Sequence, residues 1–192
     1  MIPARSLATP AQGVRPAYRV LRIALGALVV AASGQVIVPL PFTPVPFTLQ
    51  PLAVLAVGGL LGAADGAGAL VLYLALGALG LPVFAGGGSG LLRLVGPTGG
   101  YLLAFPVAAA VAGAFARAGR SGAGMVWRVL AGCVLGMAII HAGGVAQLAL
   151  LGGDPAQAFR YGFTPFFTGD LVKIGLAAAI ILLAAPRPRP AA

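Results

Sequence analysis

Long apolar stretches, separated by short polar or proline-rich breaks, dominate the chain. A helix needs roughly 20 mostly apolar residues to cross about 30 Å of hydrocarbon, and residues 23–64 contain no charged side chain at all. The pattern predicts an all-α membrane protein with six transmembrane helices. These are expected at about residues 18–38, 48–63, 67–81, 98–116, 126–151 and 166–185.

The breaks between the apolar stretches have compositions that stop helices. Residues 39–51 hold five prolines, which remove amide donors and fix φ, so this stretch predicts an extended connector. Asp65 and Gly66 predict a tight turn, and a further break begins at Pro82. None of the breaks is long enough to separate two domains. The expected organisation is an N-terminal segment over 1–17, one transmembrane domain over 18–185 and a tail over 186–192.

Composition agrees with a membrane protein. The 192 residues are 60% hydrophobic and 8% charged, whereas soluble domains average about 45–50% and about 25%. These proportions exclude a water-soluble domain and a disordered chain, and a single cysteine, Cys133, excludes a disulfide-built module. The net charge of +9 comes from cations spread between the apolar stretches. This distribution favours a membrane topology over nucleic-acid binding.

The arginines predict the orientation of the chain in the membrane. If the N-terminus is cytoplasmic, the outer loops hold only Arg93 and Arg160. The positive-inside rule then places both termini in the cytoplasm of a multi-pass cell-membrane protein, with the loops at 39–47, 82–97 and 152–165 outside. The nine arginines on the inner side are Arg5, Arg15, Arg19, Arg22, Arg117, Arg120, Arg128, Arg187 and Arg189.

Two charged residues lie inside the last apolar stretch. Asp170 and Lys173, in PFFTGDLVK, are three residues apart and therefore share one helix face. Charges in a membrane-spanning helix are unfavourable unless they are paired or hydrated, so they mark functional candidates. Two interpretations are open: an ion pair that holds the last helix to its neighbours, or a polar anchor for a ligand that enters from outside.

The remaining polar candidates are isolated along the chain. Arg93 lies in the second outer loop, where a guanidinium could bind a carboxylate in a bidentate manner or simply be solvated. His141 has no second metal-ligand residue within one helical turn, so we interpret it as an interior polar residue rather than a metal ligand. The sequence offers no catalytic set with the context of a hydrolase. We therefore expect no catalytic residue, no metal site and no cofactor.

Small residues are expected to bring helices together in the first stretch. Ala27 and Ala31 lie one turn apart, and small residues at this spacing allow two helices to approach closely in lipid. The contact could be made within the chain or with a partner protein.

Four segments in combination identify a family resemblance. They are PFTLQ (46–50), YLALGALGLPVFAGGGSG (73–90), GPTGGYLLAF (96–105) and PFFTGDLVK (165–173). Together they resemble the BioY family of biotin-binding components, or S components, of energy-coupling factor (ECF) transporters, over about residues 20–185. The resemblance implies a six-helix protein that captures extracellular biotin as its transported ligand. It also implies as partners a transmembrane coupling subunit and a pair of cytoplasmic ATPases.

The resemblance also implies roles for individual residues. Asp170 and Lys173 match the ligand-binding pair of the family's GD-x-x-K motif, and Arg93 falls at the basic position between the glycine cluster and GPTGGY. Ala27 and Ala31 resemble the small-residue face through which such components dock on the coupling subunit.

Biotin itself suits the residues near these motifs. It has an acidic tail, a ureido head and an apolar body, which a mostly apolar pocket with a few polar groups would fit. We expect Phe47, Phe84 and Tyr101 to flank the rings and the loop at 39–47 to act as a lid. Gln50 and the backbone of Gly87 complete the predicted substrate site. Open alternatives are an S component for another small vitamin and, in a different class, an intramembrane enzyme or scaffold.

Overall fold

The structure is a computed structural model, and it describes residues 16–118 and 124–185. The proposed cytoplasmic tail, most of the N-terminal segment, and Arg5, Arg15, Arg120, Arg187 and Arg189 lie outside the described residues. Every one of the six predicted apolar stretches contains a helix. The helices are α1 (Pro16–Ser33), α2 (Gln50–Leu61), α3 (Ala63–Ala78), α4 (Leu92–Val95), α5 (Gly99–Arg117), α6 (Gly124–Gly152), α7 (Pro155–Gly162) and α8 (Phe167–Ala184).

Four of these helices are long and apolar enough to cross a membrane, namely α1, α5, α6 and α8. Helices α2 and α3 correspond to the second and third predicted spans but have only 12 and 16 residues. At 1.5 Å per residue they extend for about 18 and about 24 Å, less than the thickness of the hydrocarbon layer.

The break between α2 and α3 differs from the sequence prediction. It lies at Gly62, whose φ of 86° is accessible to glycine at little energetic cost, and not at Asp65–Gly66. Asp65 is instead in the first turn of α3, where a carboxylate interacts favourably with the helix dipole. Its Oδ1 accepts a hydrogen bond from Arg19 Nε of α1 at 2.7 Å, which joins the two helices.

Short elements not predicted from the sequence form one end of the molecule. The first predicted span, 18–38, ends at Ser33 and is followed by β1 (Ile37–Val38), which pairs antiparallel with β2 (Phe47–Thr48). A one-turn 3-10 helix covers Ala85–Gly87. The outer loop predicted at 152–165 contains α7, whose first turn is capped by the Asp154 carboxylate through the amides of Ala156 and Gln157.

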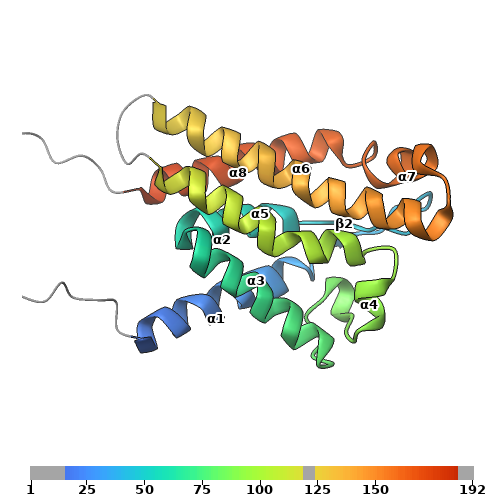
Figure 1. Cartoon of the computed structure of the whole chain (residues 1–192), viewed down its shortest axis with the longest axis horizontal. Helices are drawn as coiled ribbons and strands as arrows, with labels where there is room; N and C mark the ends of the chain where they lie inside the picture. The colour runs from blue at the N-terminus through green and yellow to red at the C-terminus, as the bar shows by residue number, and fades with distance from the viewer. Residues whose placement is uncertain (1–15, 119–123, 186–192) are drawn as a thin grey trace, which may run out of the picture.

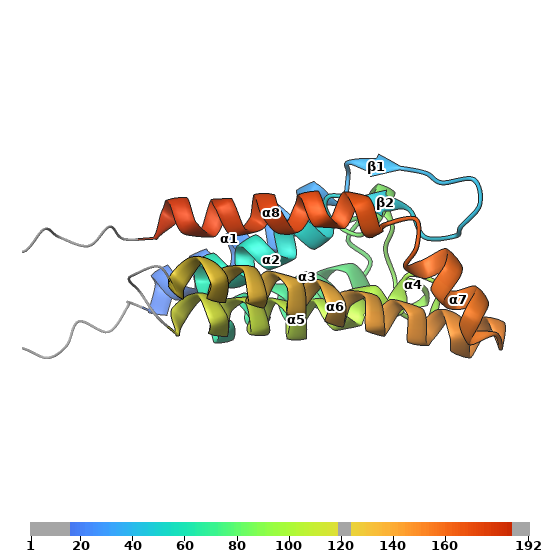
Figure 2. The same cartoon turned by 90° about the horizontal axis from the view of Figure 1, so that it is seen from above.

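The long helices lie alongside one another in a bundle (Figures 1 and 2). The beginning of α1 and the end of α8 lie at the same end of this bundle. The β1–β2 hairpin, α4 and α7 lie at the opposite end. The outward faces of α1 and α8 carry large apolar side chains that are about half exposed or more, as expected for surfaces in contact with lipid. They include Leu25, Leu28, Val29, Leu171, Val172 and Leu176.

Glycines allow the central helices to pack backbone against backbone. A Cβ added at Gly58 of α2 would collide with the backbone of Ala109 in α5, and Gly100 of α5 lies against the backbone of Gly143 in α6. Such small-residue contacts are typical of helix association in membranes, where packing replaces the hydrophobic effect. They hold α5 against both α2 and α6.

We expect Gly58→Ala to lower the thermal unfolding temperature, because the added methyl group meets backbone atoms that cannot move aside. Overpacking of this kind destabilises a protein by about 1–3 kcal/mol. The matched control is Gly175→Ala on α8, where an added Cβ has no heavy atom within 4 Å, so the better helix propensity of alanine should keep or raise the unfolding temperature. Equal unfolding temperatures in detergent for the two variants would contradict the close packing.

Candidate ligand-binding site

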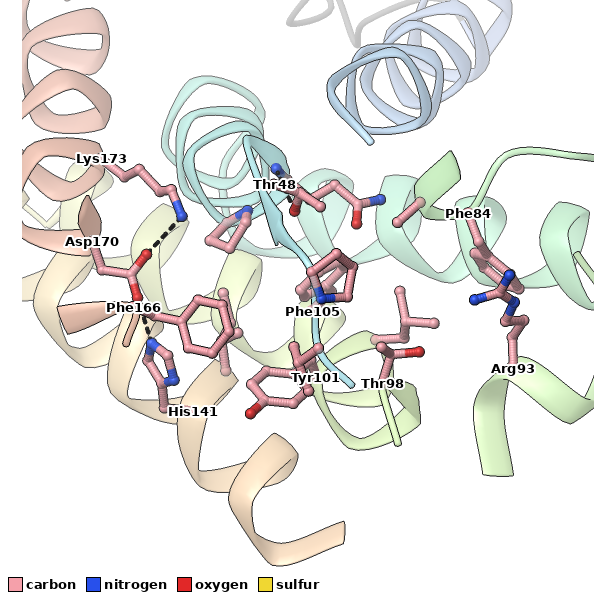
Figure 3. A pocket seen from close by; sticks show the side chains of 17 residues that line it. Thr48, Phe84, Arg93, Thr98, Tyr101, Phe105, His141, Phe166, Asp170 and Lys173 are labelled. Carbon is pink, nitrogen blue, oxygen red and sulfur yellow. Dashed lines mark hydrogen bonds and ion pairs between the residues drawn. The ribbon is translucent and has the colours of Figure 1, made fainter. Parts of the chain in front are cut away.

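A cavity lies at the end of the bundle that carries the hairpin. Its walls come from α2, α5, α6 and α8, from the 3-10 turn and α4, and from the chain around β2. Figure 3 shows side chains from these elements converging from widely separated parts of the sequence. The lining includes six residues that the sequence predicted for the site: Gln50, Phe84, Arg93, Tyr101, Asp170 and Lys173.

Asp170 is the centre of a buried charged cluster at one end of the cavity. Its Oδ1 accepts a hydrogen bond from Lys173 Nζ at 2.8 Å, and its Oδ2 lies 2.6 Å from His141 Nε2. All three residues are at most 7% exposed. A carboxylate this deeply buried requires such partners, because desolvation of an unpaired charge costs several kcal/mol.

His141 is a site residue that the sequence analysis did not place in the site. Its Nδ1 lies 3.3 Å from the carbonyl oxygen of Gly162, which also accepts a hydrogen bond from the Tyr101 hydroxyl at 2.7 Å. The two ring nitrogens of His141 thus face two acceptor oxygens, those of the Gly162 carbonyl and the Asp170 carboxylate. His141 therefore fixes Asp170 from the side opposite Lys173.

The hairpin is joined to this cluster through Phe47. Lys173 Nζ lies 3.7 Å from the centroid of the Phe47 ring, a cation–π contact. The Phe47 ring is in turn stacked on Phe166, with ring centroids 6.3 Å apart. Strand β2 thus contributes an aromatic cover over the charged cluster.

Aromatic side chains fill the middle of the cavity wall. Phe84 is 2% exposed and packs edge-on against Tyr73 at 5.5 Å between centroids. Gln50, predicted as a ligand contact, lines the cavity, but its amide nitrogen donates a hydrogen bond to the Tyr73 hydroxyl at 2.5 Å. With Tyr101 and Phe105, these residues give the cavity a mainly apolar centre.

Arg93 lies at the other end of the cavity. Figure 3 shows it beside Phe84, across the cavity from Asp170 and Lys173. It belongs to the short helix α4 and is exposed. Within residues 16–118 and 124–185 its guanidinium makes no hydrogen bond or ion pair, so its donors are available to a ligand. The cavity therefore has two polar ends separated by an apolar centre.

Three predicted residues lie elsewhere. Gly87 is exposed, does not line the cavity, and donates its backbone N–H to Gln35 Oε1 at 3.0 Å. Ala27 and Ala31 are 3% and 8% exposed, on the face of α1 where Gly26 meets side chains of α2 and α3. Gly87 is therefore outside the cavity wall, and Ala27 and Ala31 have little surface left to offer a partner.

Comparison with known proteins gives consistent matches. A family model described as the BioY family matches residues 7–189. "Biotin transporter BioY" of Thermotoga maritima is 43% identical over 145 residues, which covers 76% of this chain and 83% of that protein. "Biotin transporter BioY" of Rhizobium etli is 34% identical over 166 residues, with coverage of 84% and 89%.

A solved structure has the same overall fold. It is described as the S-component for biotin from an ECF-type ABC transporter, determined at 2.1 Å. The TM-score is 0.75 at 26% sequence identity, over 86% of this chain and 89% of that one.

The charged cluster predicts a specific pattern of stability. Lys173→Met should leave the buried Asp170 carboxylate without its lysine and destabilise the protein by about 3–5 kcal/mol, as for other broken buried ion pairs. Asp170→Asn with Lys173→Met should be more stable than Lys173→Met alone, because the unpaired charge is gone. Thermal unfolding of the purified variants measures this order of stability. A double variant whose loss of stability equals the sum of the losses in the two single variants would contradict the coupling between Asp170 and Lys173.

Proposed function

The chain belongs to the BioY family, and we propose that the cavity beside the hairpin is where it captures biotin for uptake. Biotin uptake is the function of this protein, which is a transporter component and not an enzyme. The observation that carries the assignment of the cavity is its arrangement of two polar ends around an apolar centre. Biotin has the same arrangement, with a ureido head, an apolar body and an acidic tail.

The ureido group suits the end formed by Asp170 and Lys173. A carboxylate has about four acceptor positions and an ammonium group has three donors. The bonds to His141 and Lys173 occupy two acceptor positions of Asp170, and Lys173 uses one of its three donors. Asp170 can therefore accept the ureido N–H groups while Lys173 donates to the ureido oxygen. Charge-assisted bonds of this kind are roughly twice as strong as neutral ones.

The carboxylate tail suits the end formed by Arg93. An exposed guanidinium with free donors can bind a carboxylate in a bidentate manner. At the other end, the same carboxylate would lie next to Asp170 and be repelled. The rings of Phe84, Tyr101 and Phe105 then enclose the apolar body of the ligand, as in most small-molecule sites.

The chain from β1 to β2 serves as a lid in this proposal. Val45, Pro46 and Thr48 line the cavity, and Thr43 Oγ1 donates a hydrogen bond to the carbonyl of Tyr161 in α7 at 3.0 Å. These contacts span the outer end of the bundle, so biotin would enter and leave by displacing them.

We infer six membrane crossings, with both termini cytoplasmic and the biotin cavity facing outward. In support, the beginning of α1 and the end of α8 lie at one end of the bundle, which requires an even number of crossings (Figure 2). The described arginines divide unequally between the two ends. Arg93 and Arg160 lie at the cavity end, and four lie at the other end: Arg19, Arg22, Arg117 and Arg128. The protein would then reside in the cell membrane, with residues 18–185 as its transmembrane domain.

Helices α2 and α3 would cross the membrane in spite of their length because other helices surround them. Seven of the twelve residues of α2 are buried, and short or irregular segments are tolerated at membrane depth where protein covers them.

We further propose that the chain works with a transmembrane coupling subunit and cytoplasmic ATPases. The similarity to an S-component of an ECF-type ABC transporter supports this, and the sequence has no G-x-x-x-x-G-K-[ST] loop with which to bind ATP itself. The outward face of α1, with Leu25, Leu28 and Val29, is the surface of that helix available to a partner. Biotin is the transported ligand, and no cofactor is proposed.

We expect Asp170→Asn and Arg93→Gln to weaken biotin binding for different chemical reasons. Removing a hydrogen bond to a charged group is worth about 1.5–3 kcal/mol, or about 10- to 100-fold in Kd. Asp170→Asn should weaken binding of both biotin and biotin methyl ester. Arg93→Gln should weaken binding of biotin only, because the methyl ester has no carboxylate that could pair with the guanidinium of Arg93. Calorimetry on detergent-purified protein measures each Kd.

The control for this experiment is Arg160→Gln, an exposed outer-end arginine on α7 that does not line the cavity. It should bind biotin within about twofold of the original affinity. Equal losses for the acid and the ester in Arg93→Gln would contradict the assigned direction of the ligand. Unchanged biotin affinity in folded Asp170→Asn would contradict the site itself.

The inferred orientation predicts which positions a membrane-impermeant thiol reagent can reach. In a Cys133→Ala background, Leu92→Cys should be labelled from outside intact cells and Ala118→Cys only after the membrane is opened. Both positions are exposed and lie at opposite ends of the bundle. The opposite labelling pattern would overturn the orientation without affecting the assignment of the cavity.

A further inference from the structure

A second cavity lies at the end of the bundle opposite the biotin site. Its walls are formed by the ends of five helices, α1, α2, α5, α6 and α8. Its two charged lining residues are Arg22 of α1 and Arg117 of α5, which are 95 positions apart in the sequence (117 − 22). Nothing in the biotin mechanism uses this cavity.

The two arginines converge on one acceptor. Both Nη2 groups donate to the carbonyl oxygen of Leu61, Arg22 at 3.5 Å and Arg117 through a shorter bond. Leu61 ends α2, and the change of direction at Gly62 leaves its carbonyl outside the helical hydrogen-bonding pattern. A guanidinium has five N–H donors. A single shared carbonyl therefore satisfies only a small part of the hydrogen-bonding capacity of the pair.

The chain has no side-chain carboxylate left to neutralise these arginines. It contains three acidic residues in total. Asp65 is paired with Arg19, Asp154 caps α7, and Asp170 belongs to the biotin cavity. The positive charge at Arg22 and Arg117 therefore calls for an anion from outside the chain, and two guanidiniums are well suited to bind a phosphate.

The other residues that line the cavity are apolar or glycine. Ile181 of α8 is buried in its wall, and Leu60 is 41% exposed at its edge. Beyond the cavity, Leu183 of α8 is 84% exposed. Since the charge-free stretch 23–64 begins immediately after Arg22, the arginines lie where an apolar helix surface gives way to polar chain. This is the depth at which phospholipid headgroups are found.

We propose that this cavity binds the phosphate group of an anionic phospholipid. Arg22 and Arg117 contact the phosphate, and the acyl chains lie along the exposed apolar side chains of α8. In the orientation inferred above, this lipid belongs to the cytoplasmic leaflet, whose negative surface attracts basic pockets between transmembrane helices. The site is separate from the biotin cavity and does not depend on its assignment.

The test measures lipid retention by native mass spectrometry of detergent-purified protein. Phosphatidylglycerol and phosphatidylcholine are offered in equal amounts to the original chain and to Arg22→Gln/Arg117→Gln. Arg160→Gln, which removes one positive charge at the other end, is the matched control for Arg22→Gln alone. Because Arg117 makes the shorter of the two bonds to Leu61, Arg22→Gln alone serves as a second, milder variant. Biotin affinity reports in each case that the protein is folded.

We expect the original chain and Arg160→Gln to retain phosphatidylglycerol preferentially. Each arginine removed from the cavity should reduce that preference about fivefold, with biotin affinity unchanged. An equal preference in all the folded variants would overturn the site. Displacement of phosphatidylglycerol by millimolar inorganic phosphate or glycerol 3-phosphate would show a site for soluble phosphate and overturn the assignment to lipid.

Discussion

The bond pattern around one carboxylate organises the ligand-binding half of this protein. Asp170 is buried in the apolar bundle, where an unpaired charge would not be tolerated. Lys173, which is on the same helix α8, and His141 of α6 therefore both bind the Asp170 carboxylate. Through His141 the cluster reaches the Gly162 carbonyl and Tyr101 of α5, and through Lys173 it reaches Phe47 of the hairpin. Five elements, α5, α6, α7, α8 and the hairpin, are thus connected through the contacts that begin at this single negative charge.

The two ends of the bundle use their charges in different ways. At the cavity end, the buried anion recruits cations from within the chain. At the opposite end, Arg22 and Arg117 share one backbone carbonyl, and all three acidic side chains of the chain are engaged elsewhere. The same scarcity of acidic residues underlies both arrangements. The Asp170 cluster is neutralised by cations of the chain itself, whereas the proposed site at Arg22 and Arg117 needs an anion from a bound ligand.

The sequence predicted the helices well because hydrophobic length is a local property, and all six apolar stretches contain a helix. It also placed Asp170, Lys173, Arg93, Tyr101 and Phe84 in one site. It did not place His141 there, because the partner of His141 is 29 residues away and a search within one helical turn cannot find it. Ala27 and Ala31 show the converse limit. Their spacing indicates a close helix contact but does not say which helix they contact, and in the structure they are buried within the chain.

The contact between Lys173 and Phe47 has a kinetic consequence. The ring that covers the charged cluster belongs to the proposed lid, which Thr43 also joins to α7. Arrival and departure of the ligand would both require these contacts to break, and departure would in addition require the ligand's own contacts with the cavity to break. Affinity in such a site is expressed mainly as a long residence time. The isolated chain would thus behave as a trap, and rapid delivery of its cargo would need mechanical work from outside the bundle.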